Sequence, residues 1–285
     1  MLALRQMVRP LRFLLFAPAL AAVSPALAQG RLEASYLVTL AGIPIGKGNW
    51  VVEVMDGRFS AAASGVTTGL MRVLTKGEGT SASHGTTSGG GDVLSAVYAS
   101  TVKSRKQTDE VRVTLDHGNV KEFKADPPQD HDTERVPVTA EQRRGVLDPM
   151  TASLMRVPGV GSTMVPEACQ RTLSIFDGRI RYNLRLAFKR MDKVKAQKGY
   201  AGPVVVCSIY FSPLGGHIPS RLTIRYLEAQ RDMEVWLAPI AGTRVVVPFR
   251  AQGPTPIGEA IMEATQFVTE ATPSTRASAN GAKAR

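Results

Sequence analysis

Short stretches of alternating apolar and polar residues, separated by tight turns, fill most of this chain. In LEASYLVTL, residues 32–40, the larger apolar side chains fall at every second position, the period of a strand with one buried face. Three turn sequences, Asp56-Gly57, His117-Gly118-Asn119 and Asp177-Gly178, separate pairs of such stretches and are typical of β-hairpins. Because tight turns join antiparallel strands and parallel strands need long crossovers, the pattern predicts an antiparallel meander.

Strand patterns continue to the end of the chain. They occur within residues 49–64, 109–125, 174–184, 202–213, 219–228, 232–240, 243–251 and 257–268. A dozen or so strands joined by short turns favour an all-β fold, in which a curled antiparallel meander sheet, or half-barrel, closes its apolar face on itself.

Two segments interrupt the strands. Residues 79–92, GTSASHGTTSGGGD, are rich in Gly and Ser and predict a flexible loop. The sequence LDPMTASLMRV, residues 147–157, predicts the one short helix, with Asp148 as N-cap and Pro149 at the first helical position. Met150, Leu154 and Val157 recur at helical spacing, so the helix is expected to lie against the sheet.

The first 28 residues have the pattern of a cleaved signal peptide. Three arginines precede an apolar run that ends in Ala26-Leu27-Ala28, and cleavage is expected near Ala28-Gln29. No later segment is long and apolar enough for a membrane anchor. We therefore expect an exported protein, periplasmic in a Gram-negative cell, with a single β-rich domain over 29–272 and a disordered tail over 273–285.

The charge of the chain does not point to nucleic acid. The formal net charge of +11 falls to +8 without the three signal arginines, and the tail carries three more positive charges. An exported protein with a modest remaining charge has no reason to meet nucleic acid, so attraction to anionic envelope surfaces is the better explanation.

Cys169 and Cys207 are the two cysteines of the chain. In an exported protein, a structural disulfide is the default, and no C-x-x-C spacing supports a reactive pair. Cysteines on strands two places apart in a flat sheet would lie too far from one another for a bridge. Either the sheet curls strongly there, or Cys169 lies in an irregular lead-in, VPEACQ.

The hairpin around Asp177-Gly178 carries a row of basic residues. With a two-residue turn, Ile175 faces Ile180 and Leu173 faces Tyr182, which leaves Arg179, Arg181, Arg185 and Lys189 on the opposite face. That face is either the solvated side of a half-buried sheet or a surface for an anionic partner, such as a lipid headgroup, an acidic glycan or an acidic protein. Its counter-charges could also be Glu228 and Glu234 on neighbouring strands.

Catalytic and metal-binding patterns are weak. The four histidines, His84, His117, His131 and His217, share no metal-ligand spacing. The acidic group at 130–134 has no glycine turn for a calcium loop, and residues 100–103, STVK, would place Ser and Lys on opposite faces of a strand. We therefore predict no catalytic residues, no metal and no cofactor.

Several of these stretches resemble a known family. The sequences ASYLVTLAGIPIGKGNWVVEV, LDPMTASLM, CQRTLSIFDGRIRYNLRL and YAGPVVVCSIYFSPLGG are similar to the bacterial exported proteins of the family DUF3108, over roughly residues 33 to 270. The most specific part of the resemblance is the series Cys169, Phe176 to Arg179, Tyr182, Cys207 and Tyr210. It implies an exported β protein and no particular reaction.

Three functions remain open. The first is a non-enzymatic envelope protein that holds an apolar or amphipathic, lipid-like ligand, or an envelope partner, in the concave face of its sheet. That function needs a cavity lined by residues such as Trp50, Tyr182 and Trp236, with the helix at Pro149 near its mouth. The alternatives are a hydrolase of an envelope polymer, which needs converging carboxylates or a Ser/His/Asp set, and a purely structural or assembly protein. The oligomeric state is not predicted.

Overall fold

The computed structural model describes residues 29–55, 57–69, 77–87 and 93–272. The predicted signal peptide, 1–28, and the predicted disordered tail, 273–285, lie outside these residues. The described residues form one continuous 15-stranded sheet. Its strands, in chain order, are β1 (Gly30–Leu40), β2 (Ile43–Met55), β3 (Arg58–Thr67), β4 (Glu78–Thr87), β5 (Val93–Lys103), β6 (Thr108–Asp116), β7 (Asn119–Asp126), β8 (Met155–Arg156), β9 (Arg171–Phe176), β10 (Arg181–Lys195), β11 (Lys198–Gly199), β12 (Ala201–Gly215), β13 (Met233–Pro239), β14 (Val245–Thr255) and β15 (Gly258–Ala271).

The strands form two meanders that meet in the middle of the sheet. The order is β7-β6-β5-β4-β3-β2-β1-β15-β14-β13-β12-β10-β9, so the first and last strands of the domain are neighbours. Every pair along this order is antiparallel, and β8 and β11 pair with β14 and β15 beside it. The predicted curled antiparallel meander is confirmed, and the sheet is not closed into a complete barrel.

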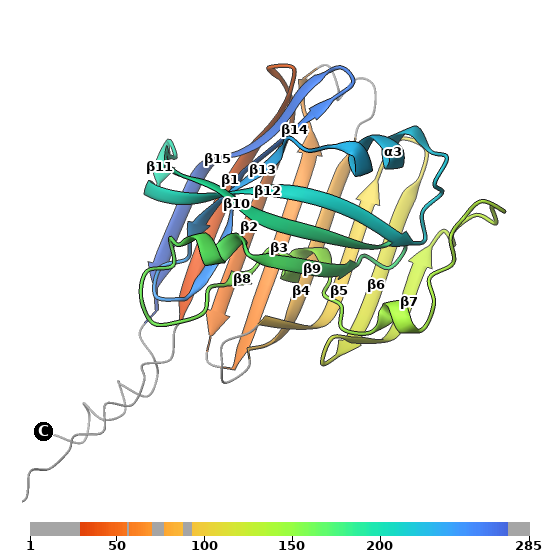
Figure 1. The fold of residues 1–285 in the computed structure, drawn as a ribbon, viewed down its shortest axis with the longest axis horizontal. Helices are drawn as coiled ribbons and strands as arrows, with labels where there is room; N and C mark the ends of the chain where they lie inside the picture. Colours follow the sequence, from red (N-terminus) through yellow and green to blue (C-terminus); the bar gives the residue numbers. More distant parts are fainter. Residues whose placement is uncertain (1–28, 56, 70–76, 88–92, 273–285) are drawn as a thin grey trace, which may run out of the picture.

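The sheet curls until its two edges approach one another. In Figure 1, β9, β10 and β12 cross in front of β3 to β6 and form a second layer. The edge strands β7 and β9 meet through an edge-to-face contact between Phe123 and Phe176, whose ring centroids are 5.4 Å apart. Between them, Val146 donates its N–H to the carbonyl of Gly118, in the β6–β7 turn, and Leu147 donates its N–H to the carbonyl of Ser174 on β9. Residues 146 and 147 therefore connect the two edges. Among the described residues, β7 and β9 do not pair directly.

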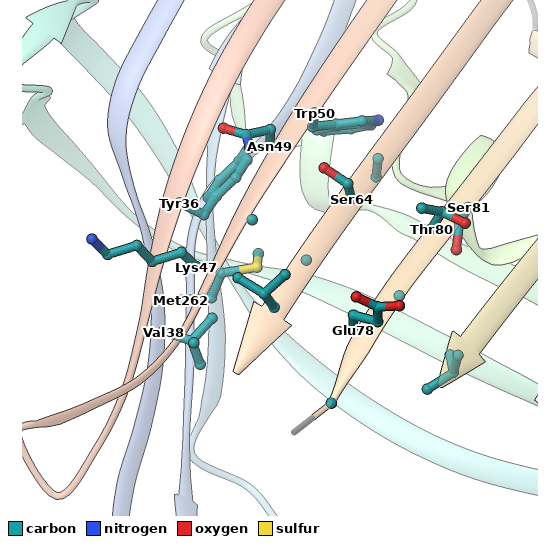
Figure 2. Close-up of a pocket in the computed structure, with 18 of the residues that line it drawn as sticks. Tyr36, Val38, Lys47, Asn49, Trp50, Ser64, Glu78, Thr80, Ser81 and Met262 are labelled. Atoms are coloured by element: carbon teal, nitrogen blue, oxygen red, sulfur yellow. The ribbon is translucent and has the colours of Figure 1, made fainter. Parts of the chain in front are cut away.

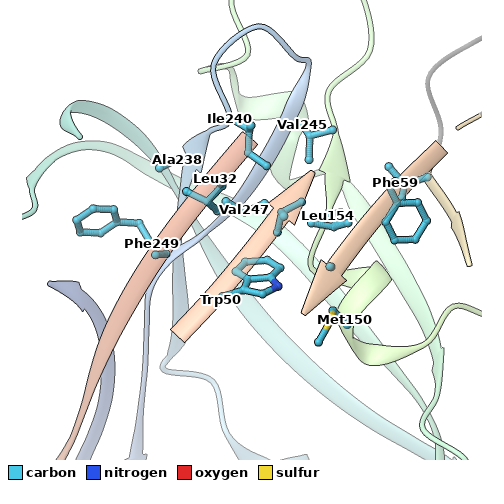
Figure 3. Packing of buried hydrophobic residues seen from close by; sticks show 14 of the residues in the cluster. Leu32, Trp50, Phe59, Met150, Leu154, Ala238, Ile240, Val245, Val247 and Phe249 are labelled. Carbon is cyan, nitrogen blue, oxygen red and sulfur yellow. The ribbon is translucent and has the colours of Figure 1, made fainter. Parts of the chain in front are cut away.

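The main core fills the space between the two layers, and Figure 3 shows Leu32, Trp50, Phe59, Val247 and Phe249 within it. A second apolar cluster lies on the other side of β12, β13 and β14. Alternate residues of these strands point into each cluster: Val204 and Val206 into the first, Val205 and Cys207 into the second. Because both faces are buried, these strands read as unbroken apolar runs and do not alternate.

The disulfide between Cys169 and Cys207 is present, with the two Cα atoms 5.4 Å apart. Cys169 ends the 3₁₀ helix η2 (Pro166–Cys169), which lies outside the sheet and contacts β10 and β12. Its position agrees with the irregular lead-in, the second of the two arrangements expected from the sequence. The bridge therefore fastens η2 over the second cluster.

The β9–β10 hairpin has a longer turn than expected. Ile175 pairs with Tyr182 and Leu173 with Leu184, so four residues, Asp177 to Ile180, form the turn instead of two. The Asp177 carboxylate accepts the N–H groups of Arg179 and Ile180, at 2.8 and 2.6 Å. This side-chain bonding stabilises the wider turn. Since the register shifts by two residues, the side chains that remain in the ladder keep their expected faces. Arg179 and Ile180, expected on the strand, lie in the turn.

Three local predictions were wrong. Of the loop predicted over 79–92, residues 79–87 belong to the interior strand β4, and residues 88–92 lie outside the described residues. Small side chains are compatible with a strand whose backbone is paired on both sides, here by β3 and β5. Residues 222–229 form the helix α3 (Leu222–Ala229), not a strand, so the structure has two α-helices in its described part. The predicted helix is a single turn, α2 (Pro149–Ala152), with Asp148 as its N-cap; Leu154 and Val157 lie beyond it. Residues 155 and 156 form β8, which pairs with β14, so the chain is no longer helical there.

Candidate ligand-binding cavity

A cavity of about 680 Å³ lies on the concave side of β1 to β5. Figure 2 shows Tyr36, Val38 and Met262 on one side of it, and Glu78, Thr80 and Ser81 on the other. Pro149, Met150 and Ser153, from α2 and its C-cap, contribute to its wall. Its volume falls within the range of roughly 300–1,000 Å³ that is usual for small-molecule sites.

The floor of the cavity is made of glycines. Gly48 on β2 is opposite Gly65 on β3, which is opposite Gly79 on β4. All three line the cavity, as does Gly46 on β2. Three neighbouring strands therefore have no side chain at the same level, and the missing side chains leave the space.

These glycines are not required by the backbone. None of the three in the row has a positive φ. A Cβ added to Gly65 or to Gly79 would meet no atom closer than 3.5 Å. On the same strand, by contrast, a Cβ on Gly85 would lie 2.0 Å from the carbonyl oxygen of Leu94. Glycine in a strand interior costs stability and often marks a place where another molecule approaches.

The α2 wall is held by one buried carboxylate. Asp148 is fully buried, and its side chain accepts the N–H groups of Met150 and Thr151 at 2.9 and 3.0 Å. It also accepts the hydroxyls of Thr151 at 2.5 Å, Ser83 at 2.9 Å, and Ser95. Asp148 thus ties the first turn of α2 to β4 and β5, which fixes Met150 at the cavity.

Two aromatic side chains shape the other wall. Tyr36 donates its hydroxyl to the carbonyl of Pro248 at 2.7 Å, and burial raises its pKa well above the ordinary value. Burial also raises the pKa of Tyr98, which lines the cavity beside the Ser81–Ser100 hydroxyl pair. Both phenols are therefore neutral at physiological pH, so the cavity wall carries no phenolate charge.

Of the three aromatic residues expected to line the concave face, one lines the cavity and two do not. Trp50 lies in the cavity wall, and its indole Nε1 is buried without an acceptor among the described residues. Tyr182 lies elsewhere and packs on Phe211, with ring centroids 5.5 Å apart. Trp236 is also elsewhere, and its Nε1 donates to Asp192 at 2.9 Å. Neither Tyr182 nor Trp236 is among the residues that line the cavity.

The basic row of the hairpin is only partly exposed to solvent: Arg185 and Lys189 are exposed, whereas Arg179 and Arg181 are not. Arg181 is buried, and its guanidinium donates to the carbonyl of Gln142 at 3.0 Å, while burial lowers its pKa. Arg179 reaches Asp109 on β6 at 3.4 Å. The turn end of this face lies against the first layer, through Arg179 and Phe176, while Leu173 and Leu186 pack with the second cluster.

The other two basic residues have separate surroundings. Arg185 is exposed and lies over the ring of Tyr210, 3.9 Å from its centroid. Lys189 pairs with Glu234 at 2.5 Å, and Arg190 pairs with the same carboxylate at 2.9 Å. Glu234 is thus the counter-charge considered from the sequence, whereas Glu228 lies on α3.

The histidines and acids of the described part of the chain form no metal-ligand set. No group of three His, Cys, Asp or Glu side chains that could hold a metal ion is found there. His84, His117 and His131 are exposed, and His217 is buried with its Nδ1 unpaired. No described helix is long and apolar enough to cross a membrane.

The sequence analysis named Trp50 and Pro149 as residues of the cavity but did not identify the glycine floor. Glycines do occur in three successive strand segments, GKGN, SGVT and GEGT. Only the register between strands reveals that they form a row, and register is not readable from one stretch at a time.

Comparison with known proteins gives a family. Residues 35–265 match the family model described as protein of unknown function (DUF3108). Among solved structures, the chain is similar to a beta-barrel-like protein of domain of unknown function DUF1849 from Brucella abortus, with a TM-score of 0.46 and 10% sequence identity. That likeness covers 87% of this chain and 100% of the other. No curated protein matches.

Proposed function

We propose that this protein, which belongs to the DUF3108 family of proteins of unknown function, is an exported, non-enzymatic envelope protein that binds an apolar or amphipathic, lipid-like molecule. The ligand occupies the concave cavity, with its apolar part on the glycine floor. One observation carries the proposal: the in-register row Gly48, Gly65 and Gly79, which leaves an open floor. At Gly65 and Gly79 neither backbone conformation nor close packing requires glycine, whereas a Cβ on Gly48 would lie 3.1 Å from the carbonyl oxygen of Ser64.

The character of the walls supports a lipid-like ligand. Aliphatic and aromatic side chains surround the floor, and the charged residues Lys47 and Glu78 also border the cavity. An apolar chain gains free energy from burial against such walls, about 25 cal/mol per Å² of apolar surface removed from water. A polar headgroup can remain near the mouth, where solvent and charged groups are available.

The disulfide supports the expected compartment. A fully buried pair of cysteines forms a bridge in this chain, and such bridges persist in oxidising compartments such as the periplasm. Together with the signal-peptide pattern, the bridge favours export. A soluble carrier or sensor of a lipid-like molecule would work in that compartment.

Filling the cavity tests the proposal. Gly65→Val and Gly79→Val each place a branched side chain on the floor, and both positions have room for a Cβ. We expect each variant to weaken binding of cis-parinaric acid, a fluorescent fatty acid, by roughly tenfold or more, which corresponds to about 1.4 kcal/mol. Fluorescence titration of the purified mature protein measures the dissociation constant.

A matched control lies on the same strand. Ala62→Val adds the same kind of side chain to the exposed face of β3, where it cannot enter the cavity, so binding should not change. If the floor variants bind the fatty acid as tightly as the native protein while remaining folded, the ligand does not occupy this cavity and the proposal is wrong.

A further inference from the structure

Four large aliphatic side chains are exposed at one end of the sheet. They are Ile43, Val66, Val102 and Ile257, with exposed fractions of 55%, 51%, 50% and 72%. We call these four residues the rim. They stand at the beginning of β2, near the ends of β3 and β5, and in the β14–β15 turn. Exposed apolar side chains gathered in one region mark a surface that meets another molecule.

The rim surrounds the open end of the cavity. Val66 and Val102 line the cavity directly. Ile43 follows the β1–β2 turn and Ile257 lies in the β14–β15 turn. The two turns are neighbours, because Ala41 donates its N–H to the carbonyl of Glu259 at 2.9 Å. Ile43 and Ile257 do not line the cavity, so the rim continues its apolar surface outward to these two turns.

Basic residues accompany the rim. Lys47 lies beside Val66 on the β2–β3 ladder, Lys103 follows Val102, and Arg105 and Lys106 form the turn after β5. Glu78 pairs with Lys103 at 3.7 Å. Within the described ranges, Lys47, Arg105 and Lys106 have no ion-pair partner. The exposed acids Glu110 and Glu259 lie at the same end of the sheet, so the positive charge is concentrated at the turn between β5 and β6, beside Val102.

From this arrangement we propose that the rim docks on the surface of an anionic phospholipid bilayer, with the mouth of the cavity facing the acyl layer. The inference rests on the proposed function, because it supplies the route by which a lipid-like ligand enters. Aliphatic tips inserted between headgroups, with lysine and arginine beside the lipid phosphates, combine the two forces that hold peripheral proteins on membranes.

The composition of the rim favours a bilayer over a protein partner. Protein interfaces are anchored by aromatic side chains in a well-packed centre. The rim has four aliphatic residues, of which one lies in a turn and one directly follows a turn, and no aromatic member. A fluid headgroup layer can accept separate protruding side chains, whereas a rigid protein surface would need matching pockets.

Vesicle flotation with the mature protein tests the proposal. The probes are vesicles of phosphatidylethanolamine with phosphatidylglycerol, and neutral vesicles of phosphatidylethanolamine with phosphatidylcholine. We expect binding to the anionic vesicles, and a loss of roughly tenfold or more for the double variant Ile43→Ser/Ile257→Ser, since each exposed isoleucine gains from leaving water. Arg105→Glu/Lys106→Glu should remove the preference for anionic vesicles.

The control changes two exposed apolar residues away from the rim. Val160→Ser/Met191→Ser alters a loop and β10, both exposed, and should leave vesicle binding unchanged. Fatty-acid binding, measured on the same samples, separates the two proposals. The rim variant should still bind cis-parinaric acid, because its substitutions do not line the cavity, whereas Gly65→Val should lose the fatty acid and still float with vesicles.

Three results would overturn docking on the bilayer. One is no binding of the native protein to anionic vesicles. Another is equal binding by the native protein and the Ile43→Ser/Ile257→Ser variant. The third is a concentration-dependent dimer, detected by light scattering, that the rim variant abolishes, because the rim would then be an interface between two copies of this chain.

Discussion

Replacement of Asp148 by alanine should weaken the fold and the cavity together. The carboxylate is the N-cap of α2, and loss of such a cap costs about 1 kcal/mol. Ser95 would lose its buried acceptor, at a cost of about 1–3 kcal/mol. Ser83 and Thr151 keep a bond to each other at 2.9 Å, so their hydroxyls remain partly satisfied.

We therefore expect Asp148→Ala to lower the free energy of unfolding by about 3 kcal/mol, out of a total of about 5–15 kcal/mol for a domain. Urea unfolding of the mature protein, followed by tryptophan fluorescence, measures the difference. Ser83→Ala removes one hydroxyl and leaves the cap, so it should cost about 1 kcal/mol. A loss below about 1 kcal/mol for Asp148→Ala would refute the role given to this carboxylate, because it would show that its five donors find other partners.

Three further predictions concern the sheet. Replacing both Cys169 and Cys207 by serine opens a loop of 38 residues and should cost about 4 kcal/mol in the chain-entropy model; urea unfolding should then no longer respond to dithiothreitol, and a persistent response would contradict the assignment. Gly85→Ala should destabilise by about 3 kcal/mol through overlap with the Leu94 carbonyl, while Gly79→Ala on the same strand should be tolerated; equal effects on the melting temperature would show that space does not distinguish them. Burial of Glu234 raises its pKa, but its hydrogen bonds to Lys189 and Arg190 outweigh burial and leave the pKa below the ordinary value. The stability that its ionised form contributes is therefore fully present above the ordinary pKa of about 4.3 and is lost as the pH falls through the lower folded-state pKa. Glu234→Gln should cost about 2 kcal/mol at neutral pH, and its difference from the native protein in urea unfolding should vanish in acid; a difference that persists or grows in acid would contradict this sign.

The antiparallel meander was predictable because its signals are local. Strands β2 and β3 pair up to Met55 and Arg58, and His117-Gly118 joins β6 to β7, where the sequence indicates hairpins; the burial of β2 alternates toward its end, as expected. The β4 strand was missed because Gly and Ser lack the bulk that marks a strand, although tertiary pairing on both sides can hold such residues extended. The helix α3 was missed because eight residues carry too little periodicity to decide between helix and strand.

The cavity was predictable only in part. Trp50 sits on a strand whose buried face is evident from its own pattern, so its side chain was assigned correctly to the concave side. Tyr182 belongs to the layer that crosses over and Trp236 to the neighbouring strand β13, and no local pattern tells which side of the sheet a buried aromatic residue faces. The burial of Arg181 has the same origin, since the carbonyl that accepts from it belongs to Gln142, far away in the sequence.

The most direct measurement of the central claim is native mass spectrometry of the exported protein, purified without detergent, followed by extraction and identification of any lipid. The account predicts an adduct of lipid-like mass on the native protein and on Ala62→Val, and its loss from the Gly65→Val/Gly79→Val variant. A bare polypeptide mass for the native protein, together with no uptake of added fatty acid, would contradict the claim that the glycine-floored cavity holds a ligand. An adduct that persists in the filled variant would place the ligand elsewhere on the molecule.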